Sequence, residues 1–207
     1  MSRVESPAGD VRVRTVTDAE GVSALAGAWE KLWLKCEGSR TPFLSFAWVQ
    51  AWLHHYGARV KPHLVLVEQG DSAICIMPLV MASYRLGGVG FDVLETLGGQ
   101  SRNLLALVAP GSEQAAAHAV AAHLLEGPLA QGACMRLDLV PSGAPFLLEL
   151  ARLLSDAGAA VSVRDVSRAP YVPLPALWDD YVQSLGRRRR KVLGRAPRSV
   201  CHARQGL

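Results

Sequence analysis

Alternating and helix-spaced apolar residues organise the first part of the chain. Residues 11–17 (VRVRTVT) alternate strictly between apolar and polar side chains, which is typical of a strand with one buried face. Asp18 is a candidate N-cap, and the large apolar residues after it recur at helical spacing up to about Cys36. Residues 41–57 (TPFLSFAWVQAWLHHYG) form a second predicted helix, with Ser45 as its candidate cap. The pattern therefore predicts one strand followed by two helices.

The second predicted helix carries an aromatic stripe. Trp48, Trp52 and Tyr56 stand at positions i, i+4 and i+8 and share one face. Such a stripe is far more often part of a core than of a ligand site, so we expect it to pack inside the domain. His54 and His55 lie on the same helix but point about 100° apart, which is poor geometry for binding one metal ion. No metal site is predicted.

Strands dominate the middle of the chain. Gly70 and Asp71 separate two of them as a hairpin-type turn. Two further helices are predicted, at residues 113–125 and 145–157. The predicted strands cover residues 63–69, 73–84, 91–97, 104–108, 134–140 and 160–166.

This order of elements predicts an α+β domain. Hairpins in the middle with helices on either side indicate a mixed, largely antiparallel sheet with helices packed on both faces. Residues 170–175 (PYVPLP) should be extended because proline prevents a helix there, and a helix is expected at residues 178–185. The expected organisation is a disordered terminus over residues 1–10, one domain over residues 11–175, and a basic helix with an irregular tail over residues 176–207.

The positive charge is concentrated at the end of the chain. The formal net charge is +4, from 22 basic and 18 acidic residues. From Arg187 onward there are eight basic residues and no acidic one, so the rest of the chain holds 14 basic against 18 acidic residues, a net charge of −4. A broad basic surface, the usual mark of a nucleic-acid-binding domain, is not predicted.

Cysteine usage and the absence of targeting signals predict a cytoplasmic protein. Cys36, Cys75, Cys134 and Cys201 are far apart and lack zinc-ligand spacing, so we expect free, buried thiols. The first ten residues, MSRVESPAGD, lack the apolar stretch of a signal peptide. The sequence contains no run of about 20 apolar residues, so no membrane span is predicted.

One glycine-rich stretch resembles a phosphate-binding motif. Residues 85–90 (RLGGVG) are similar to R-x-x-G-x-G, the pyrophosphate-binding signature of the GNAT acyltransferases. That signature needs a strand followed by a turn at a helix N-terminus, where backbone N–H groups hold the phosphates. Here a strand-like stretch follows, which favours a hairpin. Arg85, Gly88 and Gly90 are kept as candidate cofactor-binding residues.

The basic run at residues 184–195 (SLGRRRRKVLGR) has four interpretations. It is the solvated face of a helix, a phosphate-contacting patch, a nucleic-acid contact, or a contact for a membrane surface or another partner. Nucleic acid is disfavoured because no interleaved aromatic residues offer stacking. For the phosphate interpretation, the candidate anion-contacting residues are Arg187, Arg188, Arg190 and Lys191.

Several segments together resemble one family. The chain is similar to the N-terminal part of the CelD/BcsL-type acetyltransferases of the GNAT superfamily, which are sometimes described as involved in cellulose biosynthesis. The resemblance covers most of residues 10–195, and the order of its motifs is more specific than any one of them. The segments that carry it are residues 41–57, 73–79 (AICIMPL), 105–111 (LALVAPG), 136–140 (RLDLV), 170–175 and 178–195.

The resemblance implies a fold and an activity. It implies a GNAT-like domain that forms the first of two such halves, in the manner of FemAB-type aminoacyltransferases. The intact family member is expected to transfer an acetyl group from acetyl-CoA to an amine or hydroxyl acceptor, which the sequence leaves unidentified. The downstream half is expected to hold the acetyl-CoA site and most catalytic groups.

The last residues depart from the family pattern. Residues 196–207 (APRSVCHARQGL) look like a truncated or out-of-frame terminus, so this chain is expected to be inactive by itself and to bind no acetyl-CoA. The alternative function is a non-catalytic binding or scaffolding module that uses the Trp-rich helix and the basic tail. An exposed sheet edge at the severed junction would favour self-association.

Overall fold

The structure, a computed structural model, describes residues 11–36, 41–98, 106–166, 168 and 172–193. Two compact units make up the chain, Met1–Val166 and Ser167–Leu207. The strands of the first unit are β1 (Val11–Val16), β2 (Lys61–Gln69), β3 (Ser72–Leu86), β4 (Val89–Thr96), β5 (Leu107–Val108) and β6 (Cys134–Arg136). Its helices are α1 (Ala19–Ala24), α2 (Ala26–Lys35), α3 (Phe46–Tyr56), α4 (Glu113–Glu126) and α5 (Pro145–Asp156), with the short 3₁₀ turns η2 (Pro42–Leu44) and η3 (Gly57–Arg59).

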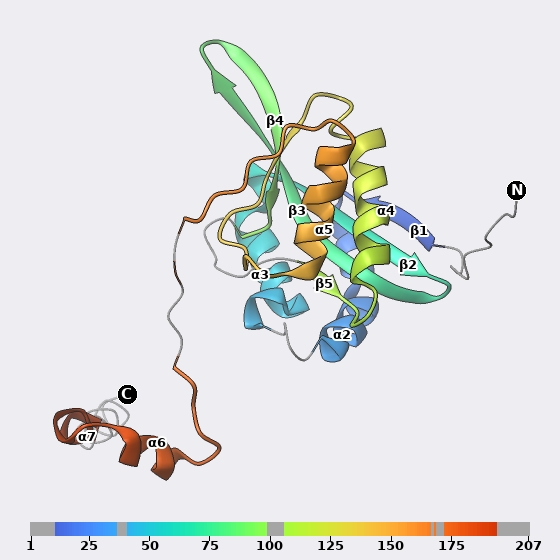
Figure 1. Cartoon of the computed structure of the whole chain (residues 1–207). Coiled ribbons are helices and arrows are strands. Elements are labelled where there is room, and N and C mark those ends of the chain that lie inside the picture. Colours follow the sequence, from blue (N-terminus) through green and yellow to red (C-terminus); the bar gives the residue numbers. More distant parts are fainter. Residues whose placement is uncertain (1–10, 37–40, 99–105, 167, 169–171, 194–207) are drawn as a thin grey trace, which may run out of the picture. The chain divides into compact units, whose positions relative to one another are not determined.

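The strands form one mixed sheet in the order β1-β2-β3-β4-β6, and β5 pairs with β3 (Figure 1). The pairs β1–β2, β2–β3, β3–β4 and β3–β5 are antiparallel, whereas β4 and β6 are parallel. A parallel pair needs a crossover connection, and α4 lies within the segment that joins β4 to β6.

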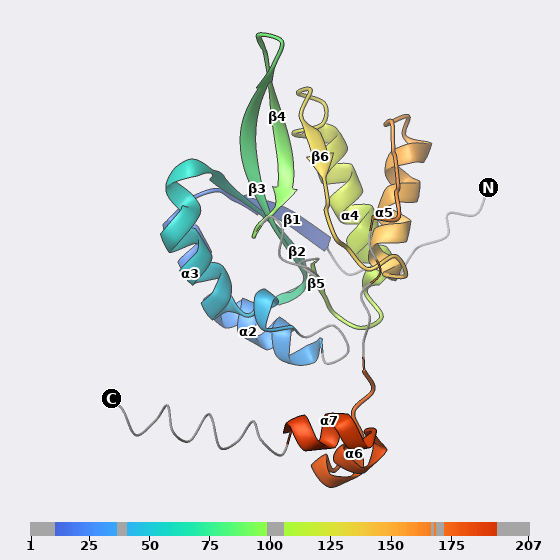
Figure 2. The same ribbon diagram turned by 90° about the vertical axis from the view of Figure 1, so that its left-hand side faces the viewer.

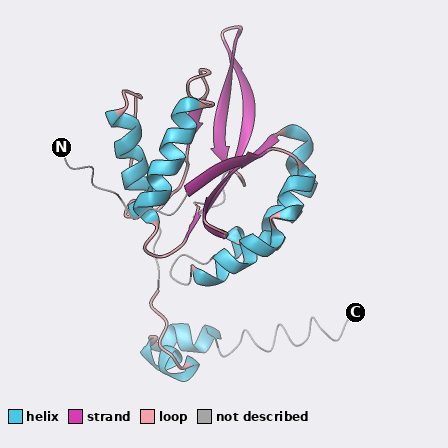
Figure 3. Cartoon of the chain, turned by 90° about the vertical axis from the view of Figure 1, so that its right-hand side faces the viewer, coloured by secondary structure: helices cyan, strands magenta, loops and turns pink. Residues whose placement is uncertain are grey.

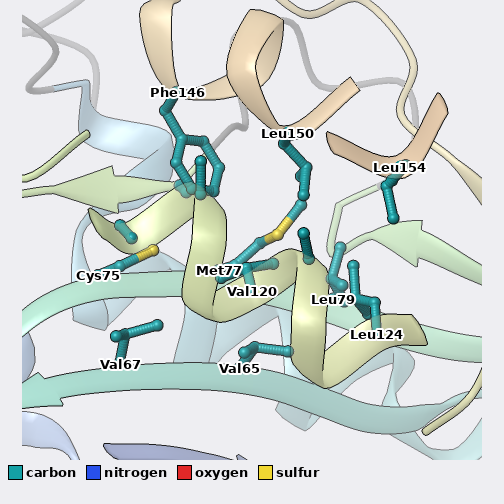
Figure 4. Packing of buried hydrophobic residues seen from close by; sticks show 14 of the residues in the cluster. Val65, Val67, Cys75, Met77, Leu79, Val120, Leu124, Phe146, Leu150 and Leu154 are labelled. Atoms are coloured by element: carbon teal, nitrogen blue, oxygen red, sulfur yellow. The ribbon is translucent and has the colours of Figure 1, made fainter. Parts of the chain in front are cut away.

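Helices cover both faces of this sheet, which confirms the predicted α+β class (Figures 2 and 3). Successive residues of β2 point to opposite faces, so Leu64 and Leu66 serve one core while Val65 and Val67 serve the other. Figure 4 shows the second of these cores, where α4 and α5 cover the sheet. Its fully or nearly fully buried side chains include Met77, Leu79, Leu94, Val120, Leu124, Phe146 and Leu150.

The opposite core lies under α1, α2 and α3, and predicted caps begin two of these helices. The Gly21 N–H donates to Asp18 Oδ1 at 2.8 Å, and the Trp48 N–H donates to Ser45 Oγ at 3.3 Å. Trp29 is completely buried in this core, and its indole Nε1 donates to the Leu44 carbonyl at 2.8 Å. That bond satisfies a polar atom that would otherwise be buried without a partner.

In its described residues, the second unit contains two short helices, α6 (Trp178–Ser184) and α7 (Arg187–Leu193). The rings of Trp178 and Tyr181 lie 5.3 Å apart on α6. No residue of either helix is buried. None of the described helices in the chain is long and apolar enough to cross a membrane.

The strand expected at residues 104–108 is present as β5 over Leu107–Val108, and residues 104 and 105 lie outside the described residues. Two other predicted strands differ from the structure. The strand expected at residues 134–140 ends at Arg136, and Leu139 has a φ of 56°, a left-handed conformation that a strand does not accommodate. The strand expected at residues 160–166 is absent, because alternation alone does not make a strand without a neighbour to pair with, and no described strand pairs with this segment.

The aromatic stripe on α3 is less buried than predicted. Val49 is the buried residue of this helix, while Trp48 and Trp52 pack against the core from its margin. The Tyr56 side chain is 46 % exposed, so its assignment to the core is wrong. The helix turns Val49 toward the sheet, and Trp29 of α2 supplies the bulk that the stripe was expected to supply.

We expect Trp29→Phe to lower the free energy of unfolding by about 1–3 kcal/mol, because it removes a buried hydrogen bond and leaves space in the core. Chemical denaturation followed by circular dichroism measures the change. Trp178→Phe makes the same replacement at a side chain that is 62 % exposed and should leave stability unchanged. Equal effects of the two substitutions would contradict the assigned role of Trp29.

Candidate functional site

The hairpin formed by β3 and β4 extends beyond the helix-covered part of the sheet (Figures 1 and 2). Leu86 pairs with Val89 at its end, so the connection is the two-residue turn Gly87-Gly88. Both glycines have positive φ, 57° and 88°, as a turn matched to the twist of a hairpin requires. The hairpin expected at residues 85–90 is therefore present.

An open cleft of about 530 Å³ lies between this hairpin and the segment that leads from α4 to β6. The hairpin supplies the polar side chains of one wall, and the α4–β6 segment supplies the other wall. The lining residues are Met81, Ser83, Tyr84, Arg85, Gly90, Phe91, Asp92, Pro128, Gln131, Gly132 and Ala133.

The register of the hairpin arranges the polar wall in two cross-strand pairs. Ser83 stands opposite Asp92, and the Ser83 hydroxyl donates to Asp92 Oδ1 at 2.6 Å. Arg85 stands opposite Gly90, whose lack of a side chain leaves open space beside the arginine. A Cβ built on Gly90 would meet nothing closer than the Tyr84 carbonyl oxygen at 4.0 Å.

Arg85 is the cation of this cleft. Among the residues that the structure describes, no carboxylate forms an ion pair with it, whereas the nearby Asp92 accepts a hydrogen bond from Ser83. A guanidinium with free donors beside open space can bind the oxygens of a phosphate or a carboxylate.

The facing wall is a turn held by its own backbone. The Gly132 N–H donates to the Leu129 carbonyl at 3.0 Å, and the Ala133 N–H donates to the Pro128 carbonyl at 3.0 Å. Gly132 has a φ of 88°, a conformation that favours glycine. These N–H groups are used within the turn, so the exposed Gln131 amide is the donor that this wall offers to a ligand.

A polar network on the other face of the hairpin joins it to β6. The Tyr84 hydroxyl donates to Glu95 Oε1 at 2.7 Å, and the Arg136 guanidinium contacts the same oxygen at 2.8 Å. The hydrogen bond to Glu95 is the main reason that the pKa of Tyr84 is raised. The network fixes the hairpin against the strand that follows the facing wall.

The structure brings together only part of the predicted cofactor-binding set. Arg85 and Gly90 line the cleft, while Gly88 lies in the turn outside the lining. The other candidates, Arg187, Arg188, Arg190 and Lys191, are exposed on α7 in the second unit. In the described part of the chain, no acidic side chain forms an ion pair with these four residues.

Sequence reasoning missed Ser83, Asp92 and Gln131. Ser83 and Asp92 could have been predicted from the sequence, because a two-residue glycine turn fixes which residues of the hairpin stand opposite each other. Counting back from Gly87 and Gly88 pairs Arg85 with Gly90 and, two residues further, Ser83 with Asp92. Gln131 gave no local signal, since the tertiary fold alone brings the α4–β6 segment to the hairpin.

The three cysteines that the structure describes differ in burial. Cys36 and Cys75 are buried, as expected, and burial raises the pKa of the Cys75 thiol, which keeps it protonated. Cys134 is exposed, contrary to expectation, because it begins the outermost strand β6. Cys201 lies outside the described residues. In the described part of the chain, no group of three or more His, Cys, Asp or Glu side chains is placed to hold a metal ion.

A second polar cluster lies where α4 crosses the start of β2. Thr15 Oγ1 and His123 Nε2 are 2.6 Å apart, and the Nε2 atom of His63 is buried without a hydrogen-bond partner. Burial lowers the pKa of His63, and the neighbouring His123 lowers it further. The fold therefore favours the neutral form of His63.

Comparisons with known proteins give limited matches. No family model matches the sequence, and no curated protein matches it. One similar solved structure is described as a probable acetyltransferase; it is 15 % identical with a TM-score of 0.40, and the match covers 79 % of this chain and 99 % of that one. Another is described as a possible acetyltransferase from Clostridium difficile 630; it is 11 % identical with a TM-score of 0.39, with the same coverage. At these values the likenesses carry no conclusion about what this chain binds.

We expect the free energy of unfolding to fall as the pH drops below about 6.5, because the unfolded chain protonates His63 more readily than the folded chain does. His63→Leu should reduce this fall, since leucine neither titrates nor leaves an unpartnered ring nitrogen. Denaturant titrations between pH 7.5 and pH 5 measure the slope. His54→Leu, an exposed control, should keep the wild-type slope. If His63→Leu keeps it too, the prediction is wrong.

Proposed function

We propose that this chain belongs to an acyltransferase of the GNAT type and that its hairpin cleft binds the phosphate-bearing part of acetyl-CoA. The reaction would transfer the acetyl group from the CoA thioester to an amine or hydroxyl acceptor. The CelD/BcsL-like motifs and the α+β sheet covered on both faces support the acyltransferase part of the proposal. The chemistry of the cleft supports the coenzyme site in this chain, which the family resemblance alone would place in a second half.

The observation that carries the proposal is the pairing of Arg85 with Gly90 at the cleft. Arg85 supplies a cation that no described carboxylate neutralises, and Gly90 leaves the space into which a phosphate would fit. Charge-assisted hydrogen bonds from guanidinium to phosphate are among the stronger polar contacts in proteins. The amide of Gln131 on the facing wall adds a neutral donor.

The cleft residues fit one phosphate group better than several. Asp92 lies one cross-strand pair away from Arg85, and its negative charge opposes a second phosphate on that side. The hydrogen bond from Ser83 offsets part of that repulsion. When bound, acetyl-CoA supplies the activated acetyl group, and the role of Arg85 and Gln131 would be to hold and orient the coenzyme.

Acyl transfer also requires a base for the acceptor and donors for the tetrahedral oxyanion. We assign neither role to a residue of this chain. In line with the family resemblance, we propose that a second GNAT-like half supplies these groups. The exposed cations of α7 are a second candidate contact for coenzyme phosphates.

The alternative, a binding module built on the Trp-rich helix, is less favoured. Trp48 and Trp52 pack against the margin of the core, so Tyr56 is the member of the aromatic stripe that is left exposed to a partner.

Calorimetric titration of the 207-residue chain with acetyl-CoA tests the proposal. We expect micromolar affinity, and Arg85→Gln should raise the Kd roughly 10- to 100-fold, the cost of about 1.5–3 kcal/mol for one charge-assisted bond. Gly90→Val should also weaken binding, because valine suits a strand but would fill the cleft. Lys61→Gln removes an exposed cation elsewhere in the sheet and should change nothing.

Two results would overturn this assignment. Absence of binding at millimolar acetyl-CoA would reject the cleft as a coenzyme site in this chain. Loss of binding in a variant with glutamine at positions 187, 188, 190 and 191, with Arg85→Gln unaffected, would move the anion contact to α7. Thermal melts of each variant distinguish lost binding from lost folding.

A further inference from the structure

The sequence after α5 is nearly symmetric in reverse. Residues 160–169 read AVSVRDVSRA. Counted outward from the bond between Arg164 and Asp165, the residues on the two sides match in pairs. The first pair is Arg164 and Asp165, which have opposite charges; the second pair is two valines and the third is two serines. The fourth pair does not match, and the fifth is two alanines. A strand with this pattern is complementary to a second copy of itself when the two run antiparallel.

The described part of this segment is free of regular structure and open to solvent. Residues 160–166 form neither helix nor strand, although their alternation and β-branched content are typical of a strand. Val163 is 81 % exposed and Val166 is 70 % exposed. Exposed valines on a strand-forming segment without a neighbour are the usual features of a pairing edge.

We propose that residues 163–166 pair antiparallel with the same residues of a second copy of this chain. The two-fold axis would pass between positions 164 and 165, as a self-complementary interface requires. Arg164 of each copy would then stand opposite Asp165 of the other copy, and Val163 would stand opposite Val166. This pairing is independent of the coenzyme-binding proposal.

The charges select this arrangement over the other possible ones. In a parallel, in-register pair, Arg164 would face Arg164 and Asp165 would face Asp165, which places like charges together. An antiparallel pair shifted by one residue would place Arg164 opposite itself or Asp165 opposite itself. Directly opposed like charges destabilise strand pairs, whereas opposite charges stabilise them.

The test is sedimentation of the full chain over protein concentrations from about 10 µM to 1 mM, a range suited to a short strand pair. We expect a monomer–dimer equilibrium in the wild type. Arg164→Asp places two aspartates opposite each other in both symmetric positions, and Asp165→Arg places two arginines there. Each variant should raise the dimer dissociation constant about tenfold or more.

Two further measurements test the register by restoring opposite charges at the paired positions. The double variant Arg164→Asp/Asp165→Arg restores opposite charges and should dimerise as the wild type does. An equimolar mixture of the two single variants should form a heterodimer, because every aspartate then faces an arginine. Lys35→Asp and Glu30→Arg make the same charge changes on the exposed face of α2 and should leave dimerisation unchanged.

The outcomes divide cleanly. A wild-type chain that stays monomeric at 1 mM overturns the proposal. A dimer that both single variants preserve also overturns it and places the interface elsewhere. Single variants that dissociate, with no recovery in either the double variant or the mixture, refute the antiparallel register.

Discussion

The pairing of β3 along both of its edges is the constraint on which the rest of the structure depends. β2 occupies one edge over most of its length, while β5 and β4 follow one another along the other edge. Side chains alternate along a strand, so the residues of β3 that pair with its neighbours also contribute to both cores. Cys75 and Met77 lie in one core and Ile76 lies in the other. Neither helical layer could pack without this strand.

The candidate site arises where β3 continues past its helical cover. Up to Leu79, the face toward α4 is apolar and fully buried. Met81 is only partly buried, and Ser83 and Arg85 on the same face are polar and exposed. The change of side-chain type along one face therefore turns a core-forming strand into a wall of a cleft. The α4–β6 segment closes the other side through a turn that depends on Gly132.

Much of the fold could be predicted from local pattern, since strong alternation and helix caps are encoded within a few residues. The caps at Asp18 and Ser45 and the glycine hairpin are of this kind. The burial of side chains and the pairing of strands were harder to predict, because they depend on residues distant in the sequence. Tyr56 and Cys134 are exposed because of how their elements meet the sheet. Residues 160–166 carry a strand pattern that no described strand pairs with.

Only part of the candidate site could be predicted from the sequence. Arg85 and Gly90 were chosen for a motif that requires a helix, and they line the cleft for a different reason, their opposition across a hairpin. Gln131 belongs to a segment more than 40 positions away, and only the crossover through α4 brings it near.

The two-residue turn at Gly87-Gly88 also limits how the β3–β4 hairpin can change in length. The inner pairs do not depend on equal additions beyond them, so Arg85 would still face the cleft and Tyr84 would still face Glu95 after both strands lengthen by the same number of residues. Opposite residues alternate between hydrogen-bonded and non-hydrogen-bonded pairs, so adding one residue to each strand would place the turn on the other kind of pair and on the opposite face. Adding two residues to each strand keeps the same kind of pair at the turn, so the hairpin can lengthen in steps of two without a new type of turn.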